Sequence, residues 1–205
     1  MNIGRLQSVT RSCDIFYQNV KICETTVLKA KSLTTLIVRR KPGRNPAAGL
    51  LQFGNRVVEC RLGRTGIRTL KMEGDGATPP GSFRILFGYM RHDRLRRSRT
   101  QIRMRSISKI DGWCDDTHSA SYNKPVRLPF GSSHEKMMRD DRLYDVCIVL
   151  NYNISPVIRN KGSAIFFHQT SEARQPTQGC VAIEPKTMQR LLPMLSGNTV
   201  LTVLS

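Results

Sequence analysis

Short apolar runs separated by glycine- and proline-containing turns make up the first half of the chain. They include "TTLIVRR" at 34–40, "LLQFG" at 50–54 and "RVVECRLG" at 56–63. Gly54-Asn55, between the last two runs, suits a tight hairpin turn. Another apolar strand is expected from about Ser82, after the turn-rich "EGDGATPPG". The first half is therefore predicted to be β-rich.

The second half adds strands and one helix. Apolar runs predict strands at 144–152, 163–169, 180–183 and close to the C-terminus, in "VLTVL". The stretch "EPKTMQRLLPML" predicts a helix that begins at Pro185 and frays at Pro193, with Met188, Leu191, Leu192 and Leu195 on one apolar face. The pattern predicts a mainly β fold with a small α content.

Two segments lack this pattern. Residues 1–32 have no clear period and are predicted to be an N-terminal extension, loosely ordered or partly helical, ahead of a domain at 33–205. Residues 91–143 are polar, basic and rich in turns, and they predict a long irregular insertion.

The chain is strongly basic. Its 33 Lys and Arg residues against 15 Asp and Glu residues give a net charge of +18, which favours polyanionic or carboxylate-rich partners. Eight cations and one acid fall in 91–109. No zinc module or aromatic stacking motif accompanies this stretch, so a solvated basic loop is favoured over a nucleic-acid site. A basic nucleic-acid-binding protein remains the alternative of a different class.

The six cysteines are scattered, without a C-x-x-C pair or a Cys/His cluster at metal-ligand spacing. We therefore expect no metal and no cofactor. Cys60 and Cys147 lie in apolar runs, where a free cysteine behaves as a small hydrophobe. No apolar run reaches the ~18 residues of a membrane span, and the N-terminus has no recognisable secretory signal.

The stretch "FFHQTSEARQPTQGCVAI" places His168 twelve residues ahead of Cys180. If His168 ends one strand and Cys180 begins the next, the loop between them can set thiol and imidazole side by side, and an imidazole activates a thiol by accepting its proton. Gly179 permits a turn that aims the amides of Gly179 and Cys180 at an oxyanion. Packing is the competing interpretation, because cysteine is often buried and a strand-end histidine often only satisfies a carbonyl.

A second motif favours catalysis. His168, Thr177, Gly179, Cys180 and Val181 resemble the signature of the L,D-transpeptidase (YkuD-type) catalytic domain, in its Gram-negative branch. The family's upstream Thr-Pro-x-Gly-x-Phe pattern is matched by Thr78, Pro79, Gly81 and Phe83 in "GATPPGSFRI". The resemblance covers about residues 33–205 and implies a β-barrel or sandwich with small helices.

The resemblance implies that Cys180 is a nucleophile and His168 its general base and acid, on peptidoglycan tetrapeptide stems. D-Ala would leave, and an amine of a second stem would resolve the thioester into a 3→3 cross-link. Water as acceptor would make the protein an L,D-carboxypeptidase, and an envelope protein could also accept the acyl group. The resemblance also implies the periplasm or cell envelope.

The substrate contacts are less well defined. Gln178 stands where many members have His, and Ala182 lies in the region where they carry Arg. Thr177, Gln178, Arg174, Arg127 and Trp113 are the candidate substrate-binding residues. Trp113 could equally be a hydrophobic anchor, and His134 with Glu135 is at least as readily a solvated pair as an acid/base pair.

Overall fold

The computed structural model describes residues 32–95, 100–171 and 173–205. The predicted N-terminal extension lies outside these residues except for Ser32. In chain order the elements are β1 (Thr35–Arg40), β2 (Ala48–Phe53), β3 (Arg56–Arg61), β4 (Gly81–Met90), β5 (Met104–Ser106), β6 (Asp111–Cys114), β7 (Pro125–Arg127), β8 (His134–Lys136), β9 (Val146–Leu150), β10 (Phe166–Gln169), β11 (Val181–Ile183), α1 (Pro185–Leu191), the 3₁₀ helix η1 (Leu192–Met194) and β12 (Val200–Val203).

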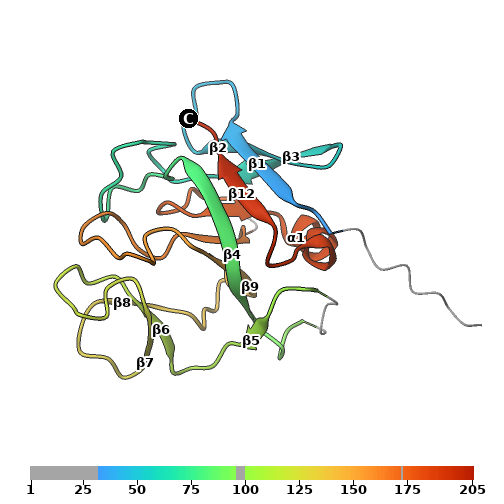
Figure 1. The fold of residues 1–205 in the computed structure, drawn as a ribbon. Coiled ribbons are helices and arrows are strands. Elements are labelled where there is room, and N and C mark those ends of the chain that lie inside the picture. The colour runs from blue at the N-terminus through green and yellow to red at the C-terminus, as the bar shows by residue number, and fades with distance from the viewer. Residues whose placement is uncertain (1–31, 96–99, 172) are drawn as a thin grey trace, which may run out of the picture.

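The main sheet closes on itself. Within the described residues its strand order is β12-β1-β2-β3-β11-β10-β9-β4-β5, and β12 also pairs with β4. This last pairing joins the two sides of the sheet into a barrel, with β5 on the edge of β4 (Figure 1). The β1–β12, β10–β11 and β4–β5 pairs are parallel and the other pairs of this sheet are antiparallel. The prediction of a mainly β, barrel-type fold is confirmed.

The predicted hairpin is present. Phe53 pairs with Arg56 across Gly54-Asn55, and Gly54 has a φ of +52°. A two-residue connection with a left-handed glycine matches the twist of the flanking strands, which explains why the local sequence was sufficient here.

Strands β9, β10 and β11 are buried on both faces. Ile165 and Phe167 pack into the main core with residues of α1, whereas Phe166 belongs to a second cluster with Trp113 and Cys180. Burial on both faces accounts for the continuous apolar runs in this part of the sequence.

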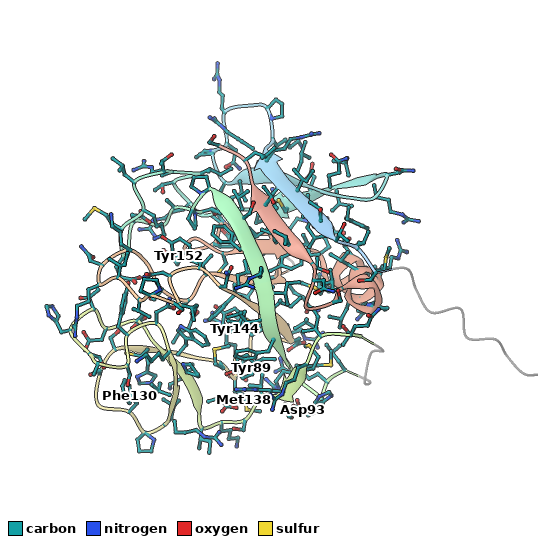
Figure 2. The ribbon with its side chains drawn as sticks, in the orientation of Figure 1. Tyr89, Asp93, Phe130, Met138, Tyr144 and Tyr152 are labelled. Carbon is teal, nitrogen blue, oxygen red and sulfur yellow. The ribbon has the colours of Figure 1, made fainter. Side chains whose placement is uncertain are left out.

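The segment 91–143 is less irregular than predicted. Strands β6, β7 and β8 form a small antiparallel sheet, drawn at the lower left of Figure 1. Figure 2 shows Tyr89 and Tyr144 near it, and both belong to the second apolar cluster together with Trp113. Strands of three or four residues are too short for a visible alternation of polar and apolar positions, so the pattern missed them.

The predicted helix is confirmed as α1, with Pro185 in its first turn and Met188 and Leu191 buried. The chain continues as η1 through Pro193, because a proline cannot donate the hydrogen bond that would extend the α-helix. No helix in the described residues is long and apolar enough to cross a membrane.

Candidate active site

Cys180 and His168 line the same cleft. The cleft has a volume of about 770 Å³ and lies between the barrel and the small sheet, which contributes His134, Glu135 and Lys136 to its wall. Gln178 and Ala182 also line it. The two side chains that the motif singled out therefore share one solvent-accessible space.

The parallel register of β10 and β11 decides how the pair is arranged. His168 is opposite Ala182, and Phe167 is opposite Val181. Cys180, one residue before β11, consequently lies beside Phe166, two positions from His168 along the sheet. The expectation that the end of one strand meets the start of the next is wrong, because strands that run the same way bring their like ends together.

The thiol is held by backbone groups at the start of β10. Cys180 Sγ donates to the carbonyl of Ala164 at 3.1 Å and accepts from the N–H of Phe166 at 3.2 Å. Within the described residues no hydrogen bond joins it to His168. Proton transfer to the imidazole thus requires the thiol to rotate away from Ala164.

The tautomer of His168 follows from its own hydrogen bond. Its Nδ1 lies 2.7 Å from the carbonyl of Gln169, and a carbonyl only accepts, so Nδ1 carries the proton. Nε2 is then the atom with a free lone pair. The Tyr144 ring packs edge-on against the imidazole, with centroids 5.1 Å apart and planes at 79°, and holds its orientation.

Both groups are neutral at rest. Burial lowers the pKa of His168 from 6.5 to about 4, and burial also raises the pKa of Cys180 from 9.0 to about 12. The charge of Glu135 adds to the rise of the thiol pKa. The resting pair is therefore thiol and imidazole rather than thiolate and imidazolium.

The buried neutral histidine predicts a loss of stability in acid. Between pH 6.5 and 4 the unfolded chain binds a proton at His168 that the folded protein does not, so the free energy of unfolding should fall by about 3 kcal/mol across this window. Urea unfolding at pH 7 and at pH 4 should show this loss in the wild type. His168→Gln should remove it, with the exposed His118→Gln as the matched single-histidine control. An undiminished loss in His168→Gln would contradict the burial argument.

Gly179 occupies a position that only glycine suits. Its φ is +137°, and a Cβ there would lie 2.7 Å from the carbonyl oxygen of Ala77. Ala77 precedes the Thr-Pro-Pro-Gly turn, in which Thr78 is fully buried and accepts the N–H of Gly63 at 2.8 Å. The Thr-Pro-Pro-Gly motif is thus a structural turn, and the residue before it packs against the loop that precedes Cys180.

The hydrogen bonds of this loop correct one expectation. The N–H of Gly179 already donates to Thr177 Oγ1 at 3.1 Å, so it is not free for an oxyanion. The Thr177 hydroxyl in turn donates to the carbonyl of Cys180 at 2.7 Å. Thr177 lines the cleft, but its hydroxyl is occupied in shaping the turn rather than available to a substrate. Of the two predicted oxyanion donors, the Cys180 amide is the one that this turn leaves unused.

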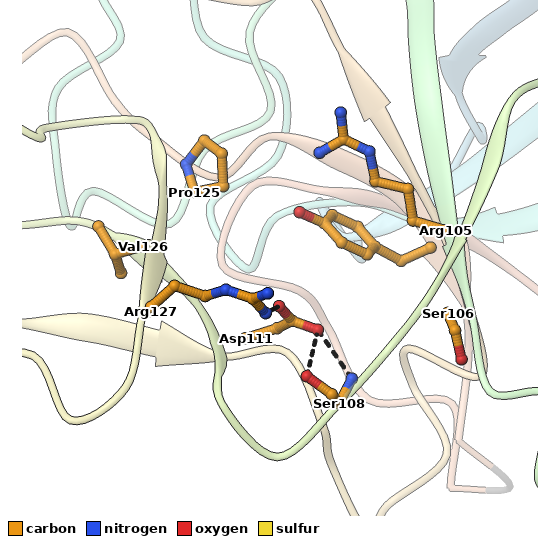
Figure 3. Close-up of a pocket in the computed structure, with 8 residues that line it drawn as sticks. Arg105, Ser106, Ser108, Asp111, Pro125, Val126 and Arg127 are labelled. Carbon is orange, nitrogen blue, oxygen red and sulfur yellow. Dashed lines mark hydrogen bonds and ion pairs between the residues drawn. The ribbon is translucent and has the colours of Figure 1, made fainter.

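The structure separates the other predicted substrate contacts. Gln178 is exposed in the cleft. Arg174 is instead paired with Glu184, beside a different and much smaller depression. Arg127 lines a separate surface pocket of about 570 Å³ and pairs with Asp111 at 2.6 Å (Figure 3). Neither arginine lines the cleft that contains Cys180.

Trp113 is the hydrophobic anchor of the alternative interpretation. It is 1% exposed, packs edge-on against Phe166 and donates from Nε1 to Asn123 Oδ1 at 2.9 Å. The same Asn123 oxygen accepts the N–H of Ala164, the residue whose carbonyl holds the thiol. Trp113 and Asn123 therefore support the backbone that holds the thiol, and neither lines the cleft in which a substrate would bind.

Sequence reasoning missed Arg139 and Tyr144 as residues of the cleft. Arg139 lines it, and Tyr144 donates to Glu135 Oε1 at 2.7 Å. Burial raises the pKa of Glu135, against the opposing effects of Tyr144 and Arg139. Glu135 and Arg139 come from the polar insertion, where no periodic signal distinguished a cleft wall from a solvated loop, and Tyr144 is the first residue of the strand predicted at 144–152.

Residues 47–203 match the family model of the L,D-transpeptidase (YkuD) catalytic domain. The chain belongs to the L,D-transpeptidase catalytic-domain family. It is thus an enzyme of a family associated with peptidoglycan, in agreement with the two motifs. This membership favours the enzyme over the nucleic-acid-binding alternative.

A similarity to a solved structure is weaker. The structure of Bd1075 from Bdellovibrio bacteriovorus has a TM-score of 0.40 and 12% sequence identity with this chain. The match covers 82% of this chain and 47% of that one, so the chain spans less than half the length of Bd1075. No curated protein shows a significant match.

Proposed function

We propose that this protein is a peptidoglycan L,D-transpeptidase that forms an acyl-enzyme on Cys180. The observation that carries the proposal is the placement of the Cys180 thiol and the His168 imidazole on one cleft, with Nε2 of His168 left as a proton acceptor by the bond to Gln169. Family membership supplies the substrate class, a peptide stem of peptidoglycan.

In the proposed first half-reaction the Cys180 proton passes to Nε2 of His168 as the thiol leaves the Ala164 carbonyl. The thiolate attacks the carbonyl at the L-centre of residue three of a tetrapeptide stem. The N–H of Cys180 stabilises the oxyanion. The intermediate collapses to a thioester, and D-Ala leaves with the proton that His168 returns to its nitrogen.

In the second half-reaction the side-chain amine of a second stem attacks the thioester carbonyl. The thiolate leaves and regains a proton, and the product is a 3→3 cross-link. Water in place of the amine would give a tripeptide, the L,D-carboxypeptidase reaction, and an envelope protein is the other acceptor to consider. This substrate places the reaction in the periplasm or cell envelope.

Incubation of the purified protein with disaccharide-tetrapeptide, followed by mass spectrometry, tests the proposal. A dimer that has lost one D-Ala is the expected product. Tripeptide alone would identify a hydrolase with the same nucleophile. Absence of both products and of a Cys180 adduct, from folded protein, would refute the proposed chemistry.

A further inference from the structure

Two carboxylates of the small sheet share one of its faces. Trp113 of β6 is paired with Glu135 of β8, and the N–H of Asp115 donates to the carbonyl of Ser133 at 3.3 Å. Alternation therefore places Asp115 and Glu135 diagonally on the same face, a position in which side chains interact. Both side chains line the cleft of Cys180.

Among the described residues, one arginine contacts this pair of carboxylates, and only at Glu135. Arg139 Nη1 lies 3.4 Å from Glu135 Oε1, but the closer contact of this arginine, 2.5 Å, is with Asp141. Lys136 is exposed and forms no ion pair with Asp115 or Glu135 in the described residues. Arg139 is thus shared between Glu135 and Asp141, and within the described residues Asp115 forms no ion pair.

Polar atoms of two residues that line the cleft also lack partners. Within the described residues Asp115 Oδ1 and Ser163 Oγ are buried without a hydrogen bond, and Ser163 is only 7% exposed. Both residues line the cleft. An unpaired buried acceptor is destabilising, and a ligand carrying hydrogen-bond donors would offset this cost.

We propose that Asp115, Glu135 and Ser163 form a binding site for the ammonium group of a peptidoglycan stem. An ammonium carries one positive charge and three donors and no acceptor, which matches two carboxylates and a hydroxyl. The inference rests on the proposed function for its ligand, the amine at the end of a diaminopimelate side chain. This amine belongs either to the donor stem, whose carbonyl is attacked, or to the acceptor stem.

Binding without turnover tests the site independently of the chemistry. Calorimetry on the Cys180→Ala protein would compare disaccharide-tetrapeptide with the same compound N-acetylated on its diaminopimelate amine. The free amine should bind at least about 10-fold more tightly. The preference should disappear when Asp115→Asn and Glu135→Gln are added, and persist with Glu59→Gln, which removes an acid from outside the cleft.

Equal binding of the two compounds to Cys180→Ala would overturn the inference, as would a preference retained by the variant lacking both carboxylates. Thermal unfolding of each variant shows whether it is folded, and Asp115→Asn alone provides a milder change if the combined variant is not. Because binding is measured without turnover, the comparison of the two compounds can still be interpreted if the transpeptidase proposal fails.

Acylation distinguishes the two sources of the amine. If the donor amine binds, intact-protein mass spectrometry should show Cys180 acylated at least about 10-fold more slowly by the N-acetylated stem, and only while both carboxylates are present. If the acceptor amine binds, acylation should be equal, and the carboxylate variants should shift the product from dimer to tripeptide. No change in either measurement would contradict a role of the site in the reaction.

Discussion

Cys180→Ala is expected to reduce product formation by at least about 1,000-fold, because no other group of the described cleft can form the thioester. The measurement is the rate of D-Ala release from disaccharide-tetrapeptide, together with the mass of the protein after incubation. The wild type should carry the acyl adduct and Cys180→Ala should not.

Cys60→Ala is the matched control. Cys60 is 2% exposed, is also free, and its pKa is also raised to about 12 by burial, but it lies in the main core and does not line the cleft. Its loss should cost stability without removing the adduct. An adduct that survives Cys180→Ala, or disappears in a folded Cys60→Ala protein, would contradict the assignment of the nucleophile.

Gly179→Ala is expected to lower the free energy of unfolding by about 2–4 kcal/mol, from an unfavourable φ and a collision with a backbone carbonyl. The added methyl would lie 2.7 Å from Ala77 O and 3.0 Å from Ile165 Cδ1. Relief of this contact requires the loop to move, and Cys180 moves with it. Activity should therefore fall at least about 10-fold even under conditions where the variant is folded.

Gly43→Ala separates the effect of the unfavourable φ from the effect of the collision with the Ala77 carbonyl. Gly43 has nearly the same φ, +133°, but a Cβ there would have no atom within 4 Å. Urea unfolding should show a smaller loss for this variant, about 1–2 kcal/mol, and normal activity. Equal losses of stability in the two variants would show that the contact with Ala77 contributes nothing.

The parts of the fold that were predicted correctly depend on neighbours in the chain. The hairpin at Gly54-Asn55 and the start of α1 at Pro185 are determined by the backbone preferences of a few adjacent residues. Barrel closure is different in kind, since β12 pairs with β1 and β4 across long stretches of chain. No local pattern encodes which strands meet.

The same division applies to the candidate site. The motif around Cys180 and His168 was recognisable because the candidate nucleophile, the candidate base and the turn residues lie within one short segment. The two arginines given as candidate substrate contacts, Arg127 and Arg174, lie outside the cleft, whereas Arg139 lines it. Position along the chain relative to Cys180 therefore did not indicate which arginine lines the cleft, because strand pairing brings distant segments together.

By itself, the sequence determined the β-rich character, the turns and the candidate pair of Cys180 and His168, because strand alternation, turn chemistry and a short motif all act over a few residues. Only the tertiary structure decided that the parallel register of β10 and β11 offsets Cys180 from His168, and that the thiol is held by Ala164. It also brought Asp115 and Glu135 of the polar insertion to the wall of the cleft. These features depend on strand pairing between segments distant in the chain, which is established only when the whole barrel and the small sheet pack together.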